Sequence, residues 1–105
     1  MPMQLILSVR LCGEMPQAKL DALRGRLGMR SIGRLTDLED AEFGYRYLRQ
    51  DKGNFVVLHL WRRRDTEWAI HLSFENEPPS DTLVHQYRSQ IFEAAAALGL
   101  IAEEA

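Results

Sequence analysis

Apolar and polar residues alternate over residues 4–11, which is the two-residue period of a β-strand with one buried face. Leucines then recur at helical spacing between Pro16 and Gly28, which predicts a first helix. Residues 29–41 show no clear period. We interpret them as a short strand at 32–35 followed by an acidic turn at 37–40.

Three further strands are predicted in the middle of the chain, over residues 43–48, 55–62 and 67–75. Asp51-Lys52-Gly53 separates the first two, and its glycine stands where a three-residue hairpin loop needs a left-handed residue. A polar turn at 63–66 separates the last two. The pattern therefore predicts a three-stranded antiparallel meander.

A second, longer helix is predicted after the strands. Ser80 is a suitable N-cap, an apolar stripe follows it, and Gly99 ends the helix. The order β-α-(β)-β-β-β-α favours an α+β fold, with a mostly antiparallel sheet of four to five strands and two helices packed on one face. With 105 residues, the chain (1–105) is expected to be a single compact domain.

The register of the predicted hairpins decides which side chains share a face, because a shift of one residue inverts a strand. The three-residue loop places Tyr45 opposite His59. In the second hairpin we favour pairing Trp61 with Trp68, because cross-strand aromatic pairs are stabilising. The face predicted to lie beneath the helices then carries Phe43, Tyr45, Tyr47, Phe55, Val57, His59, Trp61, Trp68, Ile70, Leu72 and Phe74.

The opposite face is predicted to be open, yet aliphatic side chains lie at its centre. A sheet face in water is normally polar, and an apolar patch with a charged rim is typical of a contact surface. We therefore expect a protein partner or a second copy to bind here. Two alternatives remain: residues 29–41 cover this face, or Val56, Leu58 and Leu60 are simply aliphatic side chains tolerated at the surface. The expected contact residues are Arg46, Val56, Leu58, Leu60, Arg62, Glu67, Ala69, His71, Ser73 and Glu75.

Composition and charge narrow the class of protein further. Apolar residues make up 46% of the chain and charged residues 27%, as in globular proteins. The net charge of −2 is unfavourable for a nucleic-acid binder. The single cysteine, Cys12, excludes an internal disulfide, and neither a bilayer-spanning run nor a secretory signal is recognisable. The protein is therefore expected in the cytoplasm, with no membrane partner.

No group of residues predicts catalysis, a metal site or a cofactor. The histidines lack a metal-binding spacing, and in the register above His59 and His71 lie on opposite faces. Cys12 has no base nearby in the sequence, and the glycines form no phosphate loop. We therefore expect no catalytic, metal-binding or cofactor-binding residues and no enzyme activity.

The favoured function is a non-enzymatic protein-binding module. In size, acidity and lack of motifs the chain is similar to small bacterial immunity proteins and antitoxins, although no residues carry the resemblance. It would imply that the open face docks on a toxin or effector and occludes it, while carboxylates face a basic cleft. The acidic contributors would be Glu67, Glu75, Glu77 and Asp81.

Two alternatives come from other classes. One is an RNA-binding sheet that uses aromatic residues and the hairpin tip Arg62-Arg63-Arg64, which requires the aromatic face to be the open one. The other is a small-ligand or enzyme site around Arg46, His71 and Ser73.

Overall fold

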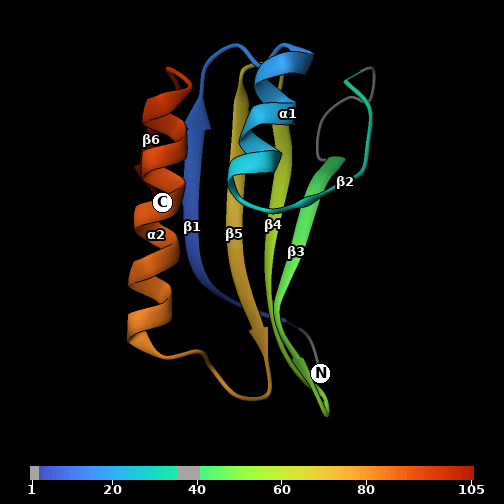
Figure 1. Cartoon of the computed structure of the whole chain (residues 1–105), viewed down its shortest axis with the longest axis vertical. Coiled ribbons are helices and arrows are strands. Elements are labelled where there is room, and N and C mark those ends of the chain that lie inside the picture. Colours follow the sequence, from blue (N-terminus) through green and yellow to red (C-terminus); the bar gives the residue numbers. More distant parts are fainter. Residues whose placement is uncertain (1–2, 36–40) are drawn as a thin grey trace.

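The computed structural model describes residues 3–35 and 41–105, and within them one sheet is covered by two helices (Figure 1). The strands are antiparallel, in the order β2-β3-β4-β5-β1-β6. The predicted α+β class is confirmed, with six strands instead of four or five. The elements are β1 (Gln4–Cys12), α1 (Gln17–Arg26), β2 (Arg30–Ser31), β3 (Ala41–Asp51), β4 (Asn54–Arg64), β5 (Glu67–Glu75), α2 (Asp81–Ala97) and β6 (Ile101–Glu104).

The two helices differ in how they begin. α2 starts as predicted, with the Ser80 hydroxyl accepting a hydrogen bond from the Leu83 amide at 3.2 Å and Asp81 in the first turn. α1 follows Pro16 and has no side-chain cap. In Figure 1, α1 lies in front of β4 and β5, and α2 runs alongside β1. Neither described helix is long and apolar enough to cross a membrane.

The two edge strands are short, and the sequence pattern located neither correctly. β6 was not predicted; it pairs with β1, where Arg10 lies opposite Glu103 and forms an ion pair with it. The short strand expected at 32–35 is instead β2, which pairs with Gly44 and Tyr45 of β3. The acidic turn expected at 37–40 lies outside the described residues.

The first hairpin has a shorter loop than predicted. It turns through Lys52 and Gly53, whose φ angles of 45° and 81° are those of a two-residue turn with left-handed backbone. The shorter loop shifts the pairing by one residue, and a bulge in β3 between Tyr47 and Arg49 shifts it back. Tyr45 therefore lies opposite His59 as predicted.

The second hairpin differs from the predicted register by one residue. Arg62 lies opposite Trp68, and Trp61 lies opposite Ala69. A bulge between Arg62 and Arg64 places one extra residue in β4, which shifts the pairing by one position. Because side chains alternate between faces, this shift inverts β4 relative to β5.

The helices therefore cover the aliphatic face of β4, and the predicted open aliphatic face is wrong. Val56, Leu58 and Leu60 are each 0% exposed. The physical reason is that aliphatic side chains carry no polar atom that must be satisfied when buried, whereas tyrosine, histidine and tryptophan do. The core between sheet and helices includes Leu7, Val9, Leu11, Leu20, Leu23, Leu27, Phe43, Val56, Leu58, Leu60, Trp68, Ile70, Leu72, Tyr87, Ile91, Ala94 and Ala95.

Candidate functional site

The sheet face opposite the helices, which we call the open face, carries most of the aromatic side chains of β3 and β4. They alternate with the buried aliphatics and so point away from the core. Tyr47 is 50% exposed, and its ring centroid lies 6.0 Å from that of Tyr45 and 6.1 Å from that of Phe55. The open face includes Leu5, Ser8, Arg10, Cys12, Glu42, Tyr45, Tyr47, Phe55, Val57, His59, Trp61, Glu67, Ala69, His71, Ser73 and Glu75. Of these, Val57, Ala69 and Ser73 are buried between their neighbours, whereas Leu5 and Tyr47 are exposed.

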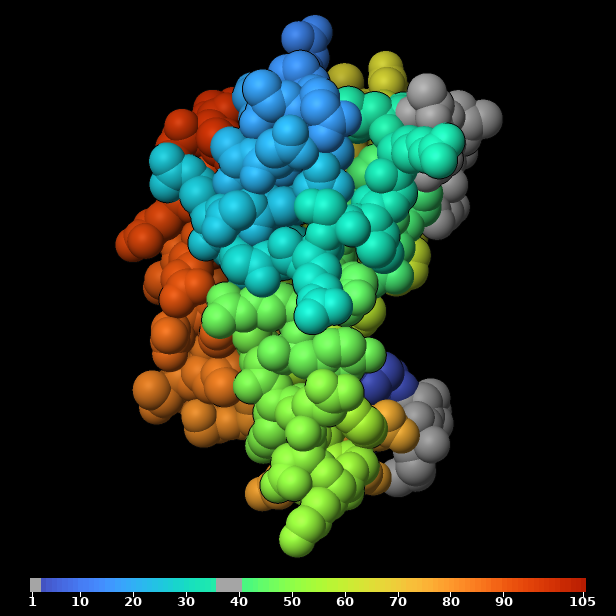
Figure 2. All heavy atoms as spheres, turned by 45° about the vertical axis from the view of Figure 1, so that its right-hand side comes forward, coloured from blue at the N-terminus to red at the C-terminus, as the bar shows by residue number. Residues whose placement is uncertain are grey.

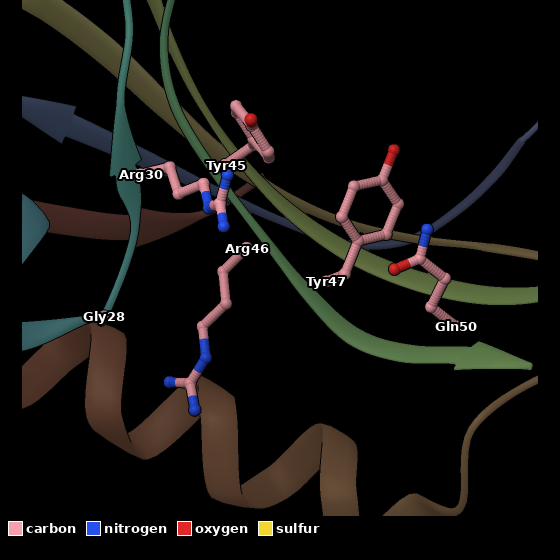
Figure 3. A pocket seen from close by; sticks show the side chains of 6 residues that line it. All are labelled: Gly28, Arg30, Tyr45, Arg46, Tyr47 and Gln50. Carbon is pink, nitrogen blue, oxygen red and sulfur yellow. The ribbon is translucent and has the colours of Figure 1, made fainter.

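A hollow of about 430 Å³ lies beside the edge of β3, next to Arg30, the first residue of β2. Figure 3 shows that the side chains of Tyr45 and Tyr47 project to one side of β3, together with Gln50, while Arg46 projects to the other side, toward α2. Arg30 of β2 lies beside Tyr45. In Figure 2 the green atoms of β3 reach the surface directly below the cyan segment that contains β2. This hollow extends the aromatic surface to the edge of the sheet.

Two histidines meet at the centre of the open face, which corrects the prediction that they lie on opposite faces. His59 lies directly opposite His71 across β4 and β5. Nδ1 of His59 is hydrogen-bonded to the Glu42 carboxylate. Burial, and after it repulsion from Arg63 and His59, lowers the pKa of His71 below its ordinary value. His71 is therefore mainly neutral at pH 7.

Two adjoining hollows flank this histidine pair. The first, of about 330 Å³, is lined by His59 and His71 together with Met3, Trp61, Arg63 and Ser73. The second, of about 300 Å³, is lined by Met3, Tyr47, Phe55, Val57, His59 and Glu75. The first combines polar groups with the apolar side chains of Met3 and Trp61, and the second is slightly more apolar but includes the carboxylate of Glu75. Among residues 3–35 and 41–105, no cluster of three His, Cys, Asp or Glu side chains could hold a metal ion.

The predicted contact residues are divided between the two faces. Those from β5 (Glu67, Ala69, His71, Ser73 and Glu75) lie on the open face. Those from β3 and β4 (Arg46, Val56, Leu58, Leu60 and Arg62) lie on the covered side, because of the shifted register.

The two arginines of this set bind the covering segments. Arg46 donates to the Leu27 carbonyl at 3.2 Å, beyond the end of α1, and its guanidinium carbon lies 5.9 Å from the Tyr87 ring centroid. Arg62 donates to the Leu35 carbonyl at 2.8 Å. The predicted site around Arg46, His71 and Ser73 is therefore wrong as a single site, because the sheet separates Arg46 from the other two.

The predicted acidic set does not form one surface either. Glu67 and Glu75 lie on the open face, but Glu77 lies on the connection to α2 and Asp81 begins that helix. The residues missed by the sequence interpretation are the aromatic ones and His59, all placed in the core by the wrong register. For Tyr45, Tyr47 and His59 the polar atom of the ring was the available signal, since such groups favour an aqueous boundary. The signal is weak, because Trp68 and Tyr87 also carry polar atoms and lie in the core.

Comparisons with known proteins suggest no role for this surface. No protein-family model, no curated protein and no solved structure matches the chain.

Proposed function

We propose that the protein is a non-enzymatic protein-binding module that contacts its partner through the open face. One observation carries this proposal: Tyr45, Tyr47, Phe55 and Trp61 lie on a sheet face that no described helix covers. An antiparallel sheet face in contact with water is usually polar. Tyrosine, tryptophan and arginine are, by contrast, the residues enriched at the energetic centres of protein interfaces.

The charges around the rings favour a protein partner. Arg10 and Arg63 share the open face with Glu42, Glu67 and Glu75. A mixed rim of this kind gives electrostatic complementarity with another protein and steers its approach. The small size and the net charge of −2 suit an inhibitor of the immunity-protein or antitoxin type, which would act by covering the functional surface of a toxin or effector.

Replacing Tyr47 with aspartate tests the contact surface. Because the Tyr47 ring is half exposed, the variant should fold, but a charge placed among the rings should abolish partner capture. The measurement is affinity purification from the native cells with mass spectrometry, alongside size-exclusion chromatography with light scattering. A homodimer that Tyr47→Asp converts to a monomer would identify a second copy as the partner.

The matched control is Gln86→Asp, an exposed position on α2. It adds the same charge to the helical side and should leave capture unchanged. Equal recovery of the same partners by wild type and Tyr47→Asp, or equal loss in both variants, would contradict the proposal.

A second candidate function is binding of single-stranded RNA, because the aromatic face is the open one. Rings on an open sheet can stack on bases. The hairpin tip contributes less than expected, since Arg62 binds Leu35 and Asp65 and lies 5.4 Å from the Trp68 ring on the covered side. Carboxylates on the same face also oppose phosphates.

Fluorescence anisotropy with single-stranded RNA distinguishes this candidate from the first. If RNA is the ligand, affinity should fall steeply with salt, and Trp61→Ala or Tyr45→Ala should weaken binding by roughly 5- to 150-fold per stacked base. A protein-binding module should show no such dependence on these rings.

A further inference from the structure

We propose that the outer edge of β3 binds an extended, acidic segment of another protein, which adds to the sheet as a short strand in line with β2. Exposed sheet edges bind extended segments through main-chain hydrogen bonds, while nearby side chains select the sequence. The site is the part of β3 from Tyr47 to Asp51, beyond the two residues that pair with β2. This inference goes beyond the proposed contact of the open face and does not depend on it.

The main-chain N–H and C=O groups of Tyr47 point away from β4 and toward this edge. In an antiparallel ladder these groups alternate in direction from one residue to the next. The Phe43 carbonyl points outward, since it accepts a hydrogen bond from the Ile32 amide at 3.3 Å. Tyr45, opposite Arg30 of β2, and then Tyr47 follow at two-residue steps before the bulge in β3. Tyr47 therefore presents a donor and an acceptor just beyond the end of β2.

The chain that precedes β2 turns away from the sheet and leaves Tyr47 without a neighbouring strand. If β2 continued in the same register, Gly28 would lie opposite Tyr47. The amides of Gly28 and Met29 donate instead to carbonyls of α1, at 3.2 Å and 2.9 Å. Gly28 and Tyr47 both line the hollow of about 430 Å³. Among the described residues, this hollow takes the place of a strand beside Tyr47.

The charge beside the edge favours an acidic segment. Arg30 is exposed and forms no ion pair within the described part of the chain. Arg46 lines the hollow from the other side of β3, and its guanidinium donates to a neutral partner, the Leu27 carbonyl. None of the described residues that line the hollow is acidic. A carboxylate in the added segment is therefore attracted by guanidinium groups that no carboxylate of the hollow neutralises.

The probe is the peptide acetyl-Thr-Glu-Val-Glu-Thr-amide, titrated into the full chain at low ionic strength and followed by NMR. In the free protein, the Tyr47 amide should exchange with solvent much faster than the Arg46 amide, which points to β4. Saturating peptide should slow exchange at Tyr47 several-fold and leave Arg46 unchanged, because only the Tyr47 amide gains a partner. A ligand that merely covers the open face would not produce this difference.

Two changes in the peptide test main-chain pairing and charge separately. Alternate amides of an extended peptide point to the same side, so only one alternating set can face β3. N-methylation of one set (either both glutamates, or the valine and the second threonine) should abolish binding, and N-methylation of the other set should leave it intact. Lysine in place of both glutamates should weaken binding by roughly 3- to 10-fold.

A charge reversal in the protein locates the acidic contact. Arg30→Glu should weaken binding of the glutamate peptide and strengthen that of the lysine peptide, each by roughly 3- to 10-fold. The matched control is Arg26→Glu, at an exposed position of α1 that does not line the hollow. It should change either affinity by less than about twofold.

Several results would overturn the proposal. They are the absence of saturable binding, unchanged exchange at Tyr47 in the saturated protein, equal effects of the two methylation patterns, and equal effects of Arg30→Glu and Arg26→Glu. Exchange at Tyr47 that slows without peptide as the protein concentration rises would assign the edge to a second copy of the chain, and would contradict the proposal as well.

Discussion

A chain in which aspartate replaces Leu60 is expected to be unfolded. Leu60 is 0% exposed and lies opposite Gly44 and Ile70, neither of which can pair with a carboxylate. The substitution removes a buried leucine and adds an unpaired charge to the core, so the loss should exceed about 5 kcal/mol, comparable with the whole stability of a small domain. Circular dichroism and NMR chemical-shift dispersion measure the outcome.

The matched control is the same substitution one residue farther along β4. Trp61 points to the open face, so Trp61→Asp should remain folded and unfold at a measurable urea concentration. A folded Leu60→Asp together with an unfolded Trp61→Asp would show that the two faces of β4 are inverted relative to the structure.

Replacing Arg24 with methionine is expected to destabilise the fold by about 3 kcal/mol, because buried carbonyls lose a charged donor. Arg24 is 5% exposed. Its guanidinium donates to the carbonyls of Phe43 at 3.1 Å and Ile32 at 3.4 Å, and to the Asp21 carboxylate at 2.7 Å. It thereby ties α1 to the segment after β2 and to β3. Methionine keeps an apolar stem and removes the hydrogen bonds together with the ion pair to Asp21.

Urea denaturation measures this loss, with Arg26→Met as the control. Arg26 is exposed at the end of the same helix, so its substitution should change the free energy of unfolding by less than about 0.5 kcal/mol. Asp21→Asn should cost much less than Arg24→Met, because the Asp21 side chain is 59% exposed. Equal losses for Arg24→Met and Arg26→Met would contradict a tying role for Arg24.

The sequence allowed the element types to be predicted, but not the face that the helices cover. Alternation and turn residues identified β1, β3, β4 and β5, and the N-cap Ser80 identified α2. Residues 55–61 are apolar or aromatic at nearly every position, so their pattern suits burial of either face. The covered face then depends on a register that bulges shift by one residue. Bulges of this kind leave no clear signal in a single sequence.

The same register error concealed the histidine pair. His59 and His71 are separated by a hairpin, and only the true pairing of β4 with β5 brings them together. β6 escaped prediction for a different reason. Its four residues, Ile101–Glu104, are too few to show an alternating pattern, and they form a strand only because β1 offers an edge to pair with.

Among the described residues, β2 pairs only with Gly44 and Tyr45, so much of the outer edge of β3 has no neighbouring strand and could pair with the strand of another chain. Arg30 and Arg46 stand on either side of β3 beside that edge. If the β3 strand of a second molecule paired with this edge, its guanidinium groups would come close to those of Arg30 and Arg46. Charged side chains beside an unpaired strand edge disfavour such pairing, so we expect the exposed part of β3 to resist edge-to-edge aggregation.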